Sequence, residues 1–143
     1  MHKEYLHAVC QKDQVVNPLF AFLGANLAHA DNGEATLILP VSMNLCQGGG
    51  LVAGGVLATL ADEAMAHAVM SVLDPSMATV TAEMNIRYLR GTDPRQGGEL
   101  TARARIIKRG RHMIYTEAHI FDSKERMLAV CGATFYAIPA KEE

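Results

Sequence analysis

A glycine-rich loop that leads into a long apolar segment is the feature that most constrains this chain. The stretch Gln47–Leu73 contains three consecutive glycines near its start, has no proline and consists mostly of Ala, Leu, Val and Met. These residues favour a helix from Gly54 to Val72, and a helix of about 18 residues is roughly 27 Å long, nearly the width of a small domain. Because this helix is apolar on most sides, we expect it to be buried.

Two features of the predicted helix point to chemistry. Ala53 precedes it, so no Ser, Thr, Asp or Asn side chain caps the first backbone amides. Asp62 lies in the middle of the apolar stretch, and its helical neighbours Ala58, Met65, Ala66 and Val69 are apolar. A carboxylate there is expected to be desolvated, which suits a general base or a nucleophile. The alternative is a structural acid held by buried backbone donors or by an arginine.

The second acid of the helix, Glu63, has different neighbours. One turn later it meets His67, at the i, i+4 spacing that lets two side chains interact. We interpret Glu63 and His67 as a pair of interacting polar side chains, a polar seam along the helix, with a structural rather than a catalytic role.

Composition and charge narrow the possible functions. A chain of 143 residues is most simply one domain, and its net charge of -2 gives no reason to expect a nucleic acid or an anionic membrane as partner. The three cysteines lack a C-x-x-C spacing, and the N-terminus lacks an apolar signal core, which favours a cytoplasmic protein with reduced thiols. The histidines show no metal-ligand spacing, so no metal is expected.

The first quarter of the chain is expected to contain short elements. Residues 1–16 form an N-terminal arm, either a short helix or a loose segment. Asn17 and Pro18 mark the start of a short helix that stops at Gly24. Two strands follow, at residues 25–30 and 34–40, and the Asp31–Gly33 turn between them predicts a hairpin.

The rest of the chain reads as strands after the long helix. Asp74 and Pro75 are expected to end that helix. Four further strands are expected, at residues 78–89, 99–109, 112–122 and 127–138. Strands arranged around one buried helix indicate an α+β fold, with an antiparallel sheet and the helix on one face, in a single domain over residues 17–143. Pairing with a second chain would help to cover this sheet.

Two motifs carry a family resemblance. The segment Gly50–Ala68, which reads GxxAGGxxxxLADEAxxxA, and the segment Thr81–Gly91, TAEMNIRYLRG, resemble the hotdog-fold acyl-CoA thioesterases of the phenylacetate-pathway type. The resemblance covers roughly residues 17–138. It implies a curved antiparallel sheet wrapped around the long helix, an acyl-CoA substrate, no cofactor, and a homodimer that pairs further into a homotetramer.

The family motif is N-x-x-G-x-x-H-G-G, with an acid seven residues after the last glycine. The glycine pair Gly54–Gly55 and the acid Asp62 match this motif. Gln47 stands at the position of the asparagine, unless a loop insertion places Asn44 there. Ala53 replaces the histidine. Because of that replacement, a non-catalytic dimer that binds acyl-CoA or another small ligand is the alternative to a hydrolase.

The resemblance also assigns roles at the site. Asp62 either attacks the thioester carbonyl or activates a water, and the Gly54 amide is the oxyanion donor. The alternative for Gly54 is a close contact between helix and sheet. Gln47 and Thr81 position the thioester or the water, although each fits an ordinary loop or strand residue equally well. Acid and hydroxyl come from one chain and the loop residues from its partner, with Gly55 also contacting the substrate.

Arginines are the candidates for the phosphates of CoA. Arg109 and Arg111 flank a glycine in a basic turn, and Arg90 is a second candidate. Arginine suits phosphate because its planar fork donates hydrogen bonds in pairs. The alternative for each arginine is a solvated strand edge.

Overall fold

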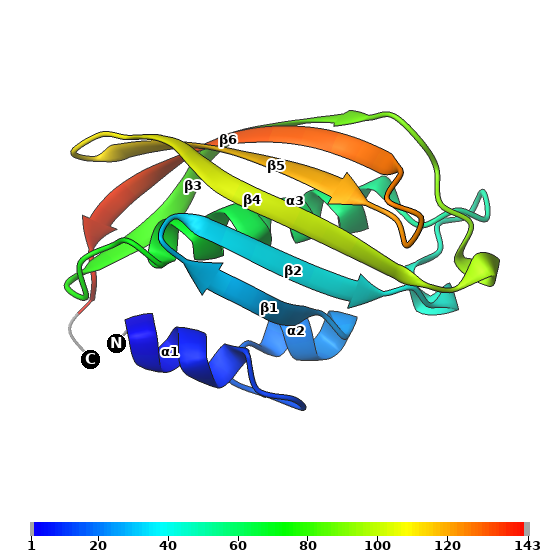
Figure 1. The fold of residues 1–143 in the computed structure, drawn as a ribbon, viewed down its shortest axis with the longest axis horizontal. Helices are drawn as coiled ribbons and strands as arrows, with labels where there is room; N and C mark the ends of the chain where they lie inside the picture. Colours follow the sequence, from blue (N-terminus) through cyan, green and yellow to red (C-terminus); the bar gives the residue numbers. More distant parts are fainter. Residues whose placement is uncertain (1, 142–143) are drawn as a thin grey trace.

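A six-stranded antiparallel sheet and one long helix dominate the computed structural model, which describes residues 2–141 (Figure 1). Residues 1, 142 and 143, at the ends of the predicted arm and domain, lie outside the described residues. In chain order the elements are α1 (His2–Val9), α2 (Pro18–Leu23), β1 (Asn26–Asp31), β2 (Glu34–Pro40), the 3-10 turn η1 (Met43–Leu45), α3 (Gly54–Met70), β3 (Met77–Tyr88), the 3-10 turn η2 (Pro94–Gln96), β4 (Glu99–Arg109), β5 (Met113–Phe121) and β6 (Met127–Pro139). The predicted α+β fold is confirmed.

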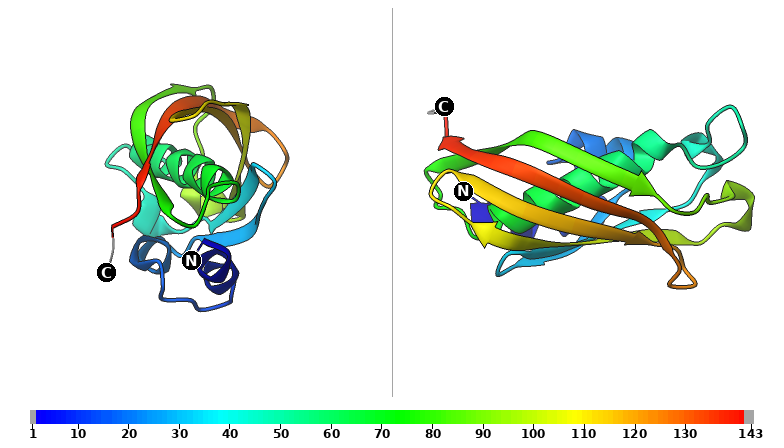
Figure 2. Two further views of the ribbon diagram at one scale, coloured as in Figure 1. Left: turned by 90° about the vertical axis from the view of Figure 1, so that its left-hand side faces the viewer. Right: turned by 90° about the horizontal axis from the view of Figure 1, so that it is seen from above.

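The sheet curves around α3, which runs through its concave side (Figure 2). The strand order is β1-β2-β4-β5-β6-β3, and every neighbouring pair is antiparallel. Alternate side chains of the inner strands point to the helix, and Leu37, Leu100, Ile120 and Phe135 are fully buried. This alternation follows from the two-residue period of a strand, which is why the sequence pattern located these strands correctly.

The short N-terminal elements form as local signals predicted. The Asn17 side chain accepts a hydrogen bond from the Phe20 amide at the start of α2, and Gly24 ends that helix in the left-handed conformation with φ 78°. The β1–β2 hairpin turns through Asn32 and Gly33, whose φ angles of 50° and 81° suit a tight turn between twisted strands. In the arm, α1 is the short helix of the two expected alternatives.

The helix α3 ends earlier than Asp74 and Pro75 suggested. Its last residue is Met70, and the Ser71 hydroxyl donates to the Ala68 carbonyl at 2.7 Å. The Gly33 amide in turn donates to the Ser71 hydroxyl at 2.9 Å, which fixes the hairpin against this end of the helix. Tertiary contact therefore helps to set the C-terminal boundary of α3.

None of the helices in residues 2–141 is long and apolar enough to span a membrane.

The outer strand β3 is the most exposed strand of the sheet. None of its 12 residues is buried, whereas each of the other five strands contains buried side chains. Its outer edge pairs with no other strand among residues 2–141, and the apolar Val80 on it is 46% exposed. A long open edge of this kind is usually covered in a soluble protein, because it would otherwise pair with other chains.

Candidate active site

The first turn of α3 presents two free backbone amides. Ala53 stands at the N-cap without a side-chain hydrogen bond, as the sequence predicted. The Val56 and Leu57 amides both donate to the Ala53 carbonyl, at 3.0 and 3.4 Å. The amides of Gly54–Gly55 have no acceptor among the described residues. They lie at the positive end of the helix and can bind a developing negative charge.

A pocket of about 310 Å³ opens beside this helix start. It brings together three predicted residues, Gln47, Gly54 and Arg90. The remaining lining residues are mostly apolar: Leu51, Val52, Leu57, Tyr88, Leu89, Gly91 and Thr92. Asn44, the alternative to Gln47, lies exposed on η1 and does not line this pocket. Of the two candidates, Gln47 is thus the one that lines this pocket.

Backbone hydrogen bonds hold the loop that carries Gln47. The Gln47 amide donates to the Leu51 carbonyl at 2.8 Å, and the Gly50 amide donates to the Gln47 carbonyl at 2.9 Å. At the helix junction, the Ala53 amide donates to the Leu45 carbonyl at 2.8 Å. The Gln47 side-chain oxygen accepts from the Gly49 amide, so its NH₂ group is the end that can reach a ligand.

Tyr88, at the end of β3, is a residue of this pocket that the sequence reasoning missed. Its hydroxyl donates to the Gly54 carbonyl at 2.7 Å. A Cβ added to Gly54 would lie 3.1 Å from the Tyr88 ring, whereas one on Gly55 would meet nothing within 4 Å. Glycine is thus required at position 54 by a close contact between helix and sheet, which is the alternative given in the sequence analysis. This contact involves the Gly54 carbonyl and Cα, so the backbone amide can still bind a ligand.

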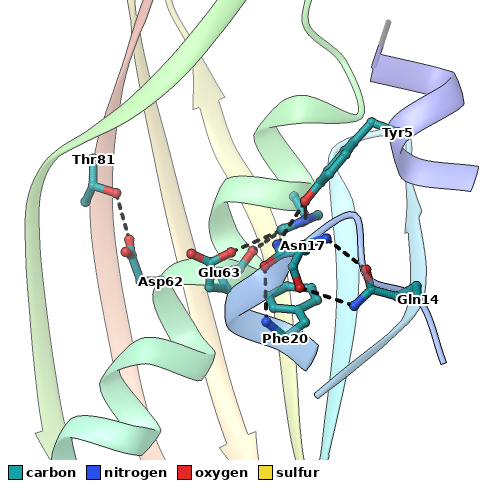
Figure 3. Close-up of polar contacts among 8 residues, drawn as sticks. Tyr5, Gln14, Asn17, Phe20, Asp62, Glu63 and Thr81 are labelled. Atoms are coloured by element: carbon teal, nitrogen blue, oxygen red, sulfur yellow. Dashed lines mark hydrogen bonds and ion pairs between the residues drawn. The ribbon is translucent and has the colours of Figure 1, made fainter. Parts of the chain in front are cut away.

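The acid of the motif contacts another of the predicted site residues. The Thr81 hydroxyl on β3 donates to Asp62 Oδ1 at 2.8 Å (Figure 3). This pair lies at the surface of the single chain, and Asp62 is only half-buried. The expectation that Asp62 is desolvated is therefore wrong for one chain. The reason is that Asp62 faces the exposed outer strand β3, where solvent still reaches the carboxylate.

Burial acts instead on the neighbouring acid, Glu63. Its side chain is 25% exposed and turns toward the N-terminal segment, on another side of α3 from the Asp62 carboxylate (Figure 3). Burial, with a smaller contribution from the adjacent Asp62 charge, raises the pKa of Glu63 from 4.5 to about 7. Consecutive residues of a helix are about 100° apart, so only one of the two acids can face the N-terminal segment.

His67 ties the N-terminal segment to α3. It is 1% exposed, and burial lowers its pKa. Its Nδ1 lies 2.6 Å from the Glu63 backbone carbonyl and 3.9 Å from the Glu63 carboxylate. Its Nε2 lies 3.1 Å from the Tyr5 hydroxyl, which accepts from the Asn17 side chain at 2.9 Å. The predicted Glu63–His67 seam exists, but the backbone carbonyl is the nearer partner of the imidazole.

The two parts of the predicted site do not meet within one chain. Gly54 and Asp62 are eight residues apart on the same helix, which separates them by about 12 Å along the helix axis. A thioester carbonyl bond is far shorter than this axial separation.

The predicted phosphate ligands lie at different ends of the strands. Arg90 follows β3 and lines the pocket at the helix start, whereas Arg109 and Arg111 lie exposed around the β4–β5 turn. Because β4 begins at Glu99, just after the loop that follows Arg90, its 11-residue length separates the two positions by about 30 Å or more. Among residues 2–141 no three His, Cys, Asp or Glu side chains converge as a metal site.

Known proteins share both the sequence pattern and the fold. A family model described as the thioesterase superfamily matches residues 49–129, more than half of the chain. A protein of Halobacterium salinarum named as a candidate esterase is 33% identical over 128 residues, covering 82% of each chain. The 1,4-dihydroxy-2-naphthoyl-CoA hydrolase of Listeria monocytogenes is 27% identical over 112 residues, covering 78% of this chain and 89% of the hydrolase.

Solved structures support the same fold. The PaaI protein from the phenylacetic acid degradation operon of E. coli superposes with a TM-score of 0.84, at 23% identity, covering 98% of this chain and 95% of PaaI. A variant of a Pseudomonas aeruginosa thioesterase superposes with a TM-score of 0.79, at 26% identity, covering 87% of this chain and 88% of the other. The expected hotdog fold, a curved sheet around one central helix, is confirmed.

Proposed function

Because the chain belongs to the thioesterase superfamily, we propose that it hydrolyses acyl-CoA thioesters at a site shared between two copies of the chain. The observation that carries this proposal is the hydrogen bond from Thr81 to Asp62 at 2.8 Å, on a helix whose first amides are free. A carboxylate held by a hydroxyl and a pair of unpaired amides are the two components that acyl transfer requires.

The chemistry follows from these groups by either of two routes. As a general base, Asp62 takes a proton from water while the water oxygen bonds to the acyl carbon. The negative charge that develops on the thioester oxygen is held by the amides of Gly54–Gly55, and Gln47 contributes its NH₂ group. The carbon–sulfur bond then breaks, and sulfur leaves with the electron pair and takes the proton from Asp62. As a nucleophile, Asp62 itself bonds to the acyl carbon while the carbon–sulfur bond breaks and the thiolate leaves. Water then hydrolyses the resulting anhydride, which releases the acid, regenerates the Asp62 carboxylate and supplies the proton that the thiolate takes up.

Two observations support a shared site. The distance of about 12 Å along α3 separates Gly54 from Asp62 within one chain. The exposed outer strand β3 carries Thr81, so a second copy that pairs along this edge would meet Asp62 and Thr81. Such pairing would also bury Asp62 and provide the desolvation that suits a base or a nucleophile. We propose a homodimer as the active unit, which can pair further into a tetramer.

The space around the helix start supports a substrate with a long polar arm. A second pocket of about 680 Å³ adjoins the first and shares Leu51, Arg90, Gly91 and Thr92 with it. The Thr92 hydroxyl at this junction is buried without a hydrogen-bond partner among the described residues. Arg90 and Lys124 are the cations of this lining that can bind the phosphates of CoA; the lining also contains the acids Asp93 and Glu99 and the ion pair between Arg126 and Asp122. The role predicted for Arg109 and Arg111 stays a prediction.

A panel of acyl-CoAs tests the function. We expect release of free thiol, followed with a thiol-reactive dye, from at least one of a set of short-chain, aryl and long-chain CoA esters. The matching N-acetylcysteamine esters, which lack the nucleotide, should react with a higher KM if the adjoining pocket binds that part of CoA. Tight binding of CoA esters without thiol release from any of them would favour a ligand-binding dimer, the alternative that Ala53 motivates.

A mixing experiment tests the shared site. Asp62→Asn and Gly54→Val should each be inactive alone, because one lacks the acid and the other blocks the amide and clashes with Tyr88. In a mixed dimer, one of the two sites combines the intact Asp62 of one chain with the intact Gly54 of the other. Unfolding and refolding the variants together should therefore restore roughly a quarter of wild-type activity, given random pairing. Mixtures as inactive as the separate variants would place the whole site in one chain.

A further inference from the structure

The peptide group between Gly54 and Gly55 is bonded at one end and free at the other. Its carbonyl oxygen, that of Gly54, accepts from the Tyr88 hydroxyl at 2.7 Å. Its N–H, that of Gly55, is one of the two free amides of the α3 start. Gly55 is exposed, and a Cβ there would meet nothing within 4 Å, so a ligand can approach this N–H closely.

A hydrogen bond to the carbonyl of a peptide affects the N–H of the same peptide. The two ends share one conjugated unit, so a donor on the oxygen draws electron density from the nitrogen and makes the N–H a stronger donor. The positive end of the helix acts in the same direction. Tyr88 therefore strengthens the exposed Gly55 amide, which directly follows the pocket-lining residue Gly54.

The other hydroxyl in this turn shows why the position of Tyr88 matters. The Thr59 hydroxyl donates to the Gly55 carbonyl at 2.9 Å. This carbonyl belongs to the Gly55–Val56 peptide, whose N–H is the Val56 amide. That amide already donates to the Ala53 carbonyl at 3.0 Å and has no proton left for a ligand. Tyr88 is the hydroxyl whose peptide partner remains free.

Position 54 is adapted to this contact. The Tyr88 ring lies so close that a Cβ on residue 54 would be 3.1 Å from the ring carbon and 3.2 Å from the hydroxyl oxygen. Only glycine lets the phenol reach the carbonyl without displacement. Tyr88 also comes from β3 and not from the helix, so it fixes the first turn of α3 against the sheet.

We propose that Tyr88 is a positioning residue for thioester hydrolysis, which orients and polarises the Gly54–Gly55 peptide so that the Gly55 amide is a principal donor to the oxyanion. This inference rests on the proposed function. It assigns no contact between Tyr88 and the reacting atoms; the effect reaches the oxyanion through the peptide.

Tyr88→Phe tests the inference, because it removes the hydroxyl and keeps the ring that lines the pocket. We expect kcat to fall about 3- to 10-fold, less than for loss of a whole oxyanion donor, while KM stays within twofold. Tyr115→Phe is the matched control: Tyr115 is 40% exposed on β5, between buried neighbours that face the core, and its variant should keep both constants. An unchanged kcat in Tyr88→Phe, or a loss confined to KM, overturns the inference.

The amide proton of Gly55 gives a second readout that does not depend on turnover. In ¹H–¹⁵N spectra, Tyr88→Phe should shift the Gly55 proton upfield, since the amide loses polarisation, and Tyr115→Phe should leave it in place. An unmoved Gly55 resonance overturns the inference even if kcat falls. A wild-type protein that releases no thiol from any thioester overturns the proposed function and the inference together, whereas an active wild type with an unaffected Tyr88→Phe overturns the inference alone.

Discussion

Asp62→Asn should lower kcat for thioester hydrolysis by about 10²- to 10⁴-fold, the range that a positioned base contributes. The asparagine oxygen can still accept the hydrogen bond that Thr81 donates to Asp62 Oδ1 at 2.8 Å, so the local geometry should survive. What is lost is the negative charge, and with it both the base and the nucleophile. Thiol release under single-turnover conditions measures the effect, and circular dichroism with sedimentation checks that fold and assembly are unchanged.

The adjacent acid provides the control for this experiment. Glu63→Gln changes a carboxylate to an amide one residue away, on the side of α3 that faces His67. Because Glu63 is directed away from the Thr81 contact, we expect its variant to keep kcat within about threefold near pH 7. Substantial turnover by Asp62→Asn, or an equal loss in Glu63→Gln, would move the catalytic role away from Asp62.

Glu63→Gln should also change how stability depends on pH. The folded-state pKa of Glu63 is about 7, raised from 4.5 by burial, so between these values the folded protein holds a proton that the unfolded chain has released. Stability must then fall as pH rises through this window, because ionisation is harder in the folded state. The full difference is on the order of 3 kcal/mol for a side chain that is 25% exposed.

The measurement is the free energy of unfolding in urea from pH 4.5 to 8.5, at one fixed protein concentration because an oligomer unfolds in a concentration-dependent way. Relative to wild type, Glu63→Gln should gain stability progressively as pH rises toward 8. Glu34→Gln, on the exposed hairpin, is the matched control and should follow the wild-type curve. Parallel curves for wild type and Glu63→Gln would show that Glu63 is not desolvated in the assembled protein.

His67 acts in the opposite direction over part of this range. Burial lowers its pKa, so below its ordinary value of 6.5 the unfolded chain takes up a proton that the folded protein excludes, and stability is lost as pH falls. Comparison of each variant with wild type at the same pH removes the part of this contribution that does not depend on Glu63, since His67 is present in both. Because the two side chains are 3.9 Å apart, the difference between the two curves reports the ionisation of Glu63 together with its coupling to His67.

Local patterns predicted the elements because they depend on neighbouring residues. Asn17 and Pro18 began α2, Asn32 and Gly33 made the hairpin turn, and alternating apolar residues such as Leu37 and Leu100 located the strands. The uncapped first turn of α3 could also be predicted from the sequence, because side-chain capping depends on one residue, Ala53. The family resemblance then proposed Asp62 and the Thr81 hydroxyl as site residues of one chain, which periodicity could not; the hydrogen bond between them came from the structure.

The tertiary structure decided what covers each side of α3. The sequence determined a buried, uncapped helix with two adjacent acids and predicted that Asp62 would be the desolvated one. The structure places the N-terminal segment, with Tyr5 a full 62 residues before its partner His67, over Glu63 instead. Likewise Tyr88 reaches Gly54 across 34 residues. The helical repeat determines that consecutive side chains such as Asp62 and Glu63 point to different sides of the helix. Which side is buried depends on the distant segment that packs against it, and this is decided by the tertiary fold.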